Sequence, residues 1–421
     1  MSAAERIETD VLIVGGGPAG ALLGFLLARR GVDVLVVEKQ TSLEREFRGE
    51  TIAAPSVVTL RQLGFGPALD AHGYLRTEGV TMYMEGRRVF QVDYRRFPVG
   101  EVPIDMPQPG LIQIFLDAAA NHPTFHHEFG TAFTDLVRDG DTVLGATLRR
   151  RDGSTVEVRS RLLVGADGRF SKVRRVAGLT ADVQPMARDF LQFRLPRPAD
   201  WGLQAELIVD HDRHLVVLPT FPNFIRVGNN LPKRGMGELR KAGFEAFRDG
   251  IMRLYPRLAP VVAEHLRSWD DTAFLDIFTA EVPVWTRDGL VLIGDASHTC
   301  TPILGQGVNV AIQDAVCLAP VVARVLAEGH RVVPAAALAD FVEQRRRHKS
   351  FVTKFQRIQE AALAQRNWSG VLLRRARYRT LNALPLKYRI FGKVLTAPHT
   401  VDPADLAPGA DAVHSGVASA A

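Results

Sequence analysis

The stretch DVLIVGGGPAGALLGFLLARRGVDVLVVEK, residues 10–39, decides the fold of this chain. An apolar run leads into a glycine-rich loop, an apolar segment of helical period follows and stops at Gly31, and a second apolar run completes the stretch. These patterns predict a strand, a tight turn, a helix and a second strand. Because a helix joins the two strands, they are expected to pair in parallel as a βαβ unit.

The loop GGGPAG has the spacing G-x-G-x-x-G at the junction of strand and helix. Gly15 permits the tight turn, Gly17 lets the backbone approach a pyrophosphate, and Gly20 lets the helix pack closely on the strand. Glu38 ends the second strand, where a carboxylate accepts hydrogen bonds from ribose hydroxyls and disfavours a 2′-phosphate. A glycine turn without a ligand is the alternative, but all four features fall in register. We therefore expect FAD or NAD(H) here, held by Gly15, Gly17, Pro18, Ala19, Gly20, Glu38 and Lys39.

Composition narrows the function classes. The 421 residues are 46% hydrophobic and carry 52 Lys+Arg against 46 Asp+Glu, a net charge of +6 that is too diffuse for a nucleic-acid surface. Two cysteines, Cys300 and Cys317, provide no disulfide framework. The N-terminus has no signal-peptide pattern, and the apolar runs are shorter than the ~20 residues that span a bilayer. A cytoplasmic location is expected.

Further along the chain the patterns change twice. A strand-rich region with one helix, roughly 236–255, interrupts the α/β pattern, which then returns near Asp288. We predict a discontinuous FAD-binding or dinucleotide-binding domain, a substrate-binding domain inserted into it, a C-terminal helical segment and a disordered tail. Their expected ranges are 1–75, 99–180 and 281–345 for the first, 76–98 and 181–280 for the second, 346–400 for the third and 401–421 for the tail.

Two more loops carry motifs. LLVGADGRFSKVRR, residues 162–175, is a strand, an Asp-Gly turn and a short helix, and GDASHTCTPILGQGVN, residues 294–309, is a glycine-flanked loop that opens a long apolar helix. Together with GGGPAG, these motifs resemble in order and separation the FAD-dependent group A monooxygenases, the para-hydroxybenzoate hydroxylase-like family. The resemblance covers most of residues 7–345. It implies an α/β fold with a Rossmann-like FAD-binding domain of the GR2 type, an interleaved α+β substrate domain under a β-sheet, and C-terminal helices.

The resemblance also implies how one extended FAD is held. Asp167 and Gly168 match residues near its ribose or pyrophosphate, while Arg48 and Gln113 match positions of FAD-contacting side chains. Asp295 follows a strand where a carboxylate can accept from ribityl hydroxyls, and the glycines after it let the backbone approach the ring. The helix that follows points its N-terminus at the ring edge where reduction places negative charge. The expected contacts in this third loop are Gly294, Asp295, Pro302, Gly305, Gln306, Gly307, Val308 and Asn309, with Pro302, Gly305, Gln306 and Gly307 lining the flavin. His298 is expected to order the loop rather than to catalyse.

The implied reaction is oxygenation of an apolar, aromatic or polyketide-like small molecule by C4a-hydroperoxyflavin, with NADPH or NADH as a transient hydride donor. Hydroxylation and epoxidation both remain open, and the catalytic side chains are unknown. Alternatives are an FAD-dependent reductase of an isoprenoid or unsaturated substrate, a non-catalytic flavin-binding partner, and a flavin halogenase, which is disfavoured because its Trp-x-Trp-x-Ile-Pro pattern is absent.

Substrate residues are less readable, and Phe193, Arg194 and Arg226 are the candidates. The run VDHDRH, residues 209–214, could be drawn as a two-His-one-carboxylate metal site, but a polar hairpin turn is favoured and no metal is expected. The basic and apolar segment 371–395 could dock on the FAD domain, or could contact a membrane surface or a partner. A monomer or a homodimer is expected.

Overall fold

The first elements of the chain form the expected parallel unit. β1 (Glu5–Val14) pairs in parallel with β2 (Val34–Glu38), and α1 (Pro18–Arg29) connects them. This computed structural model describes residues 5–43, 50–365, 367–395 and 401–407. Ten of the eleven residues of α1 that follow Pro18 are apolar or glycine, so that helix can be buried between the sheet and its neighbours.

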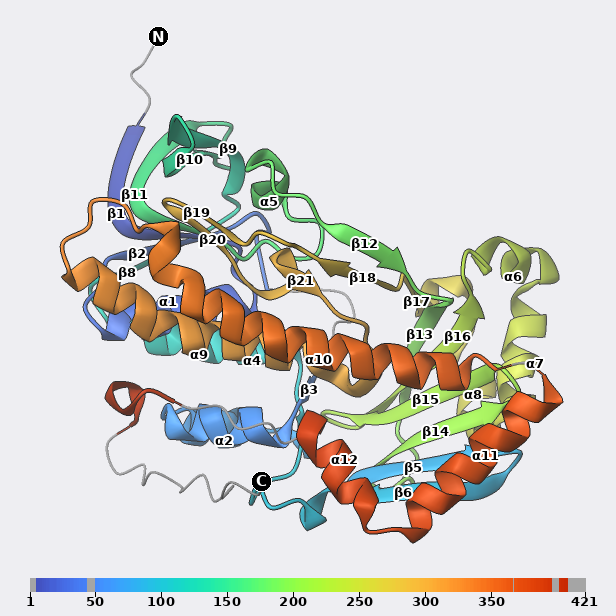
Figure 1. The fold of residues 1–421 in the computed structure, drawn as a ribbon. Coiled ribbons are helices and arrows are strands. Elements are labelled where there is room, and N and C mark those ends of the chain that lie inside the picture. The colour runs from blue at the N-terminus through green and yellow to red at the C-terminus, as the bar shows by residue number, and fades with distance from the viewer. Residues whose placement is uncertain (1–4, 44–49, 366, 396–400, 408–421) are drawn as a thin grey trace.

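An eight-stranded sheet grows outward from this unit in the order β19-β20-β11-β1-β2-β8, and β10 and β9 branch from β11 (Figure 1). β11 and β20 run parallel to β1. The added strands are β8 (Phe125–Phe129), β9 (Ala132–Asp139), β10 (Thr142–Arg149), β11 (Thr155–Gly165), β19 (Thr286–Arg287) and β20 (Leu290–Leu292). The carboxyl ends of parallel strands meet at one edge of a sheet, so the loops that leave β1, β11 and β20 emerge together.

Helices cover this sheet. α1 packs between α4 (Gln108–Ala119) and α9 (Gln306–Ala327), and their apolar side chains join the largest core cluster. The segment Ile303–Ala327 is long and apolar enough to cross a membrane, but 67% of its most apolar window is buried within the protein, as expected of a core helix. Shorter elements complete this half of the molecule: α2 (Ala54–Gln62), α3 (Gly66–His72), α5 (Lys172–Val176), β3 (Thr51–Ile52), β4 (Leu75–Arg76) and β7 (Ile104–Asp105).

A second sheet has seven strands in the order β17-β13-β16-β15-β14-β5-β6. It draws them from the two segments that the sequence assigned to substrate binding: β5 (Gly79–Met84), β6 (Arg87–Asp93), β13 (Arg188–Pro196), β14 (Gln204–Asp210), β15 (Arg213–Thr220), β16 (Phe224–Pro232) and β17 (Thr272–Leu275). A small sheet of β12 (Asp182–Pro185), β18 (Phe278–Glu281) and β21 (His298–Thr299) lies between the two large ones (Figure 1). The third motif therefore contributes a strand to the junction.

Three helices cover one face of the seven-stranded sheet: α6 (Met236–Ala242), α7 (Phe244–Leu254) and α8 (Ala259–His265). The sequence predicted one helix across the first two. The structure breaks it at Gly243, whose φ of 93° is outside the helical region and is readily adopted only by glycine.

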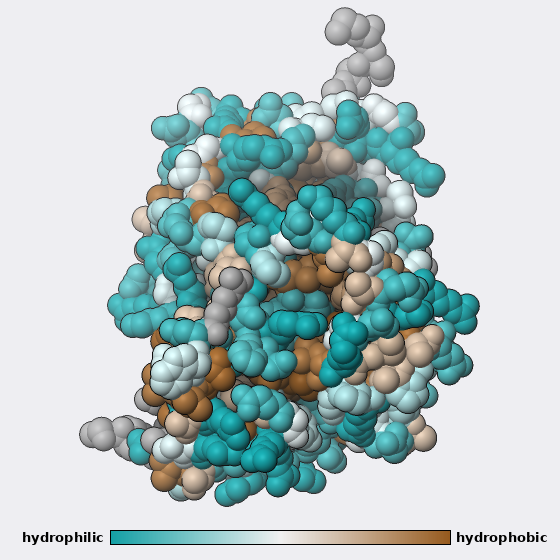
Figure 2. Space-filling model, turned by 90° about the vertical axis from the view of Figure 1, so that its right-hand side faces the viewer, coloured by the Kyte–Doolittle hydropathy of each residue, from teal (hydrophilic) through white to brown (hydrophobic). Residues whose placement is uncertain are grey.

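The C-terminal helices bridge the two halves. α10 (Ala339–Leu363) runs from the FAD-binding half to the seven-stranded sheet, and α11 (Trp368–Ala383) and α12 (Leu386–Leu395) lie beyond it (Figure 1). Segment 371–395 docks on this second sheet rather than on the first, because Tyr378 and Phe391 pack against Phe90. The side of the molecule that carries α6, α7 and α11 shows apolar side chains in separate patches among hydrophilic ones (Figure 2).

Residues 401–407, which the composition assigned to a disordered tail, lie against the FAD-binding half instead. Asp405 is fully buried there, and its two carboxylate oxygens accept from Nε and Nη2 of Arg30 at 2.9 Å each. Arg29 also pairs with Asp405, at 3.3 Å. A single buried carboxylate between two arginines can hold a segment in place even when its few apolar side chains contribute little to its stability. The composition of the segment does not reveal such a contact. The positions after 407 lie outside the described residues.

Asp405→Asn should lower the free energy of unfolding by about 2–4 kcal/mol, because it removes one partner of a buried ion pair. Urea unfolding measures this loss. Asp402→Asn is the matched control, since Asp402 is 34% exposed and lies 3.2 Å from Arg30, so the loss should stay below about 1 kcal/mol. Equal losses in the two variants would contradict the importance of the buried pair.

Candidate active site

The register of the first sheet brings the three motif loops together. Val14 is the partner of Gly165, and Gly165 is the partner of Leu292, so the three parallel strands end side by side. Gly15 has a φ of 112°, and a Cβ on it would lie 2.4 Å from the carbonyl oxygen of Ala166. The first and second loops are therefore in contact, and only glycine fits between them.

The start of α1 fits a pyrophosphate. A Cβ on Gly20 would lie 2.0 Å from the carbonyl oxygen of Gly15, so this glycine lets the helix approach the loop. Gly17 is the N-cap, Pro18 follows, and within the described residues no side chain caps the helix and no acidic residue lies in its first turn. The N–H donors and the positive end of the helix dipole are thus directed to an open position, as an anion requires.

Glu38 lies beside this loop. Its Oε2 accepts from the backbone N–H of Gly16 at 3.0 Å and its Oε1 accepts from that of Gln40 at 3.0 Å. The side chain is buried, whereas the neighbouring Lys39 is exposed. Glu38 thus stands where the sequence expected a ribose partner, next to the first glycines of the loop.

The two carboxylate oxygens of Asp167 differ in their hydrogen bonds. Its Oδ2 accepts from the backbone N–H groups of Lys172 and Val173 at 2.7 and 3.0 Å, which caps α5, and Gly168 turns the chain with a φ of 85°. Its Oδ1 is buried and has no hydrogen-bond partner among the described residues. Since a buried acceptor without a donor is unfavourable, this oxygen fits a ligand hydroxyl, such as that of a ribose.

The third loop has an unusual backbone just before α9. Leu304 and Gly305 have φ values of 63° and 60°, both left-handed. The side chain of Gln306 donates to the carbonyl of Leu304 at 2.9 Å. Asn309 is buried, donates to the carbonyl of Gly305 at 2.8 Å, and accepts from the N–H of Ala53 at 2.8 Å. Asn309 therefore fixes the loop to the segment around β3.

The other predicted residues of this loop differ in exposure. Pro302 is exposed and Gly307 is half-buried with open space beside its Cα, while Gly294 and Val308 are buried and Asp295 is half-buried. α9 begins with no side-chain cap and no acidic residue in its first turn, within the described part of the chain. The exposed side of the loop thus presents backbone N–H groups, which suits the electron-rich edge of a flavin.

The predicted cofactor contact Gln113 makes its described hydrogen bond within its own helix. Gln113 is exposed on α4, where its amide donates to Oδ1 of Asp117 at 2.6 Å. Arg48 lies outside the described residues. The substrate candidates separate as well: Phe193 is fully buried against Phe247 under the helices of the second sheet. Arg226 is on the opposite face of that sheet, because side chains alternate along a strand.

Arg226 belongs to an ionic cluster that the sequence reading missed. Its Nη1 lies 3.2 Å from Oε2 of Glu50, and its Nη2 lies 3.8 Å from Oδ2 of Asp105. Arg194, the strand partner of Arg226, lies 3.2 Å from the other oxygen of Glu50. Glu50 directly precedes Thr51, whose side chain faces Gly305. The run FRGET carried a weak signal: Glu50 is an acidic residue directly before a short strand and two positions after an arginine.

Burial changes the acidity of one carboxyl group in this cluster. It raises the pKa of Asp105 to about 6, and the neighbouring Glu50 adds to the rise while Arg226 opposes it. With all groups ionised, two arginines balance two carboxylates. The cluster therefore holds an acid that titrates near neutrality at the junction of the two halves.

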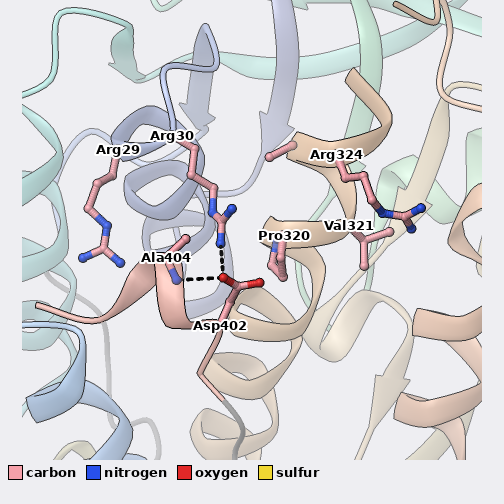
Figure 3. A pocket seen from close by; sticks show the side chains of 8 residues that line it. Arg29, Arg30, Pro320, Val321, Arg324, Asp402 and Ala404 are labelled. Carbon is pink, nitrogen blue, oxygen red and sulfur yellow. Dashed lines mark hydrogen bonds and ion pairs between the residues drawn. The ribbon is translucent and has the colours of Figure 1, made fainter. Parts of the chain in front are cut away.

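A surface depression lies elsewhere. It measures about 650 Å³ and is formed by the end of α1, by α9 and by the docked segment around Asp402 (Figure 3). Arg30 points to Asp402, while Arg29 and Arg324 point away from each other. These arginines do not converge on a common ligand, so the depression is not a candidate active site. Of the run VDHDRH, His211 and Asp212 form the turn between β14 and β15, while Val209 and His214 are buried on those two strands.

Gly15→Ala should give a protein that purifies without the yellow absorbance of a flavin, because the new methyl group would push the first two loops apart. Gly31→Ala is the matched control: Gly31 also has a positive φ, 77°, but no atom lies within 4 Å of its added Cβ. The control should lose about 1 kcal/mol of stability and keep the flavin. Flavin retained in the Gly15 variant would contradict this assignment of the loop.

Acid should destabilise the protein through His298, which is buried and 2.7 Å from Oγ1 of Thr353. Burial and the nearby charge of Lys349 lower the pKa of His298 to about 3, whereas an unfolded histidine titrates near ~6.5. Between these values the unfolded chain binds a proton that the folded protein does not, so stability falls as the pH drops. In His298→Gln, urea unfolding between about pH 6 and 4 should show a slope smaller by about 1.4 kcal/mol per pH unit. An unchanged slope would contradict this.

Comparison with known proteins agrees with this geometry. Residues 8–355 match the family described as FAD binding domain. The chain is 36% identical over 330 residues to a 6-methylpretetramide 4-monooxygenase of Streptomyces rimosus. The aligned region covers 78% of this chain and 77% of that protein. The fold resembles PqsL, a probable FAD-dependent monooxygenase from Pseudomonas aeruginosa, with a TM-score of 0.75 and 24% identity over 87% of this chain and 99% of that one.

The flavin-dependent brominase Bmp2 is a similar structure, with a TM-score of 0.73 and 19% identity over 92% of this chain and 93% of that one. At that identity the likeness concerns the fold alone. The match across the three motif loops is the decisive one, and it confirms the family that their sequences indicated. The chain belongs to the FAD-binding-domain family and is an FAD-dependent monooxygenase of the group A, para-hydroxybenzoate hydroxylase-like flavoproteins.

Proposed function

We propose that this monooxygenase hydroxylates a polycyclic phenol of polyketide type, with NADH or NADPH as hydride donor and O₂ as oxidant. The relative from Streptomyces rimosus supports the substrate class, since by its name it acts on 6-methylpretetramide. The observation that carries the proposal is the Arg194 and Arg226 pair, which shares Glu50, the residue directly before Thr51, whose side chain faces Gly305 of the third loop.

The sheet face around these arginines combines apolar and cationic groups. Leu218 is the strand partner of Arg226, and Val216 is that of Gly228; both apolar side chains are half-buried on this face. Apolar surface with a few directed polar groups is typical of a pocket for an aromatic ligand. The 31% of the Arg194 side chain that is exposed offers a cation to a phenolate or enolate oxygen.

Glu50 and Asp105 would set the charge of this pocket. Glu50 holds both guanidinium groups in place, which limits the ordering cost when a substrate binds. Asp105 titrates near neutrality, so it can take up a proton when an anionic oxygen enters the cluster. In this proposal the pocket binds the ionised phenol without leaving a net buried charge.

The proposed cofactor contacts follow the three loops. The start of α1 would hold the pyrophosphate, Asp167 and Glu38 would accept from sugar hydroxyls, and Asp295 would accept from the ribityl chain. When bound, FAD supplies hydride acceptance and oxygen transfer. The first turn of α9 would donate N–H groups to negative charge at the ring edge, and the sheet above it would exclude water.

The test is turnover by purified FAD-loaded protein with a panel of tricyclic and tetracyclic phenols, each with NADH and with NADPH. We expect one of the two coenzymes, NADH or NADPH, to be oxidised only when substrate is present. The product should be heavier by one oxygen atom, and that atom should carry the label when ¹⁸O₂ is supplied. Glu50→Gln should raise KM more than it lowers kcat, since it releases the arginines that bind the substrate. A product gaining two hydrogens without O₂ would indicate a reductase, and a product gaining a halide would indicate a halogenase.

A further inference from the structure

α10 contacts the third motif loop along one stripe. Arg345, Lys349, Thr353 and Gln356 are spaced by four, four and three residues, so they lie on one side of the helix. Nε of Arg345 and Nζ of Lys349 lie 2.7 and 2.6 Å from the two oxygens of Asp314, which also accepts from the N–H of Gly294. The stripe thus reaches the loop from its first glycine onward.

Gln356 makes the contact closest to the expected ring. Its side chain is fully buried, and its Oε1 accepts from the N–H of Thr301 at 3.1 Å. Its Nε2 donates to the carbonyls of Thr301 and Ile303 at 3.0 and 2.7 Å. Both protons of the amide are therefore used on the backbone that immediately precedes Leu304. A left-handed leucine is unfavourable and persists only where its surroundings hold it.

The carbonyl oxygens of residues 301–305 all have protein donors. Gln356 donates to the first and third, the N–H of Gly305 donates to the second at 2.9 Å, and Gln306 and Asn309 donate to the fourth and fifth. The negative ends of these peptide dipoles are thus directed to the protein. The N–H groups at the start of α9 are left for a ligand.

We propose that Gln356 is a positioning residue that sets the affinity for FAD and the reduction potential of the bound flavin. It holds the loop carbonyls away from the ring, so that the ring meets N–H donors rather than carbonyl oxygens. This inference rests on the proposed placement of the flavin ring against residues 302–309. Without Gln356 the loop can turn a carbonyl toward the ring, which opposes the negative charge of reduction.

The test compares Gln356→Leu with Gln359→Leu. Gln359 is a buried glutamine about one turn further along the same helix, where it accepts from the hydroxyl of Tyr378 on α11 at 2.7 Å instead of holding the loop. Both variants lose buried hydrogen bonds, so both should have a lower melting temperature. Only Gln356→Leu should bind FAD more weakly, by roughly 10-fold, and show a more negative midpoint potential of the bound flavin.

Fluorescence quenching of FAD gives the dissociation constant, and spectroelectrochemistry gives the potential. If Gln356→Leu does not fold, Gln356→Glu keeps the shape and one acceptor, and the same two changes are expected. Equal potentials in wild-type protein and the Gln356 variant would overturn the inference while leaving the proposed function intact. A wild-type protein that does not bind FAD would instead overturn the proposed function.

Discussion

The parallel register of three strands is the constraint on which the site depends. Val14, Gly165 and Leu292 are neighbours across the sheet, although about 280 positions separate the first from the last along the chain. Backbone hydrogen bonds fix this alignment, and a slip of one residue would turn every side chain of a strand to the other face. Each motif loop can therefore differ in sequence and still emerge at the same edge.

Much of this could be predicted from local patterns. The first glycine loop, its helix and the acidic residue that ends the second strand lie in one contiguous stretch of sequence. The order and separation of the three motifs then indicated that their loops hold one FAD. Contacts that depend on which face of the sheet a side chain occupies could not be predicted. Phe193 and Arg226 are on opposite faces because of the register between β13 and β16. The stripe on α10 lies some 50 residues after the loop that it holds, so no local pattern indicates that the two meet. A single buried carboxylate, Asp405, likewise outweighed the polar composition around it.

Buried charge recurs where segments distant in sequence meet. Asp314 joins α10 to the third loop, Glu50 joins the segment before β3 to the seven-stranded sheet, and Asp405 joins the C-terminal segment to α1. Ion pairs of this kind pay a large desolvation cost, so each contributes less to net stability than its short distances suggest. Their geometric demand is strict, however, since a misplaced partner leaves an unpaired charge in the interior. They specify how the halves of the molecule fit together.

The bridging course of α10 has a consequence for biosynthesis. A ribosome releases the amino end of a protein first, and domains fold as their last strands become available. Here the first glycine loop leaves the ribosome long before the residues that complete the cradle, because Gln356 follows it by more than 300 positions. The complete set of residues around the three motif loops is therefore present only after nearly all of the polypeptide has been translated.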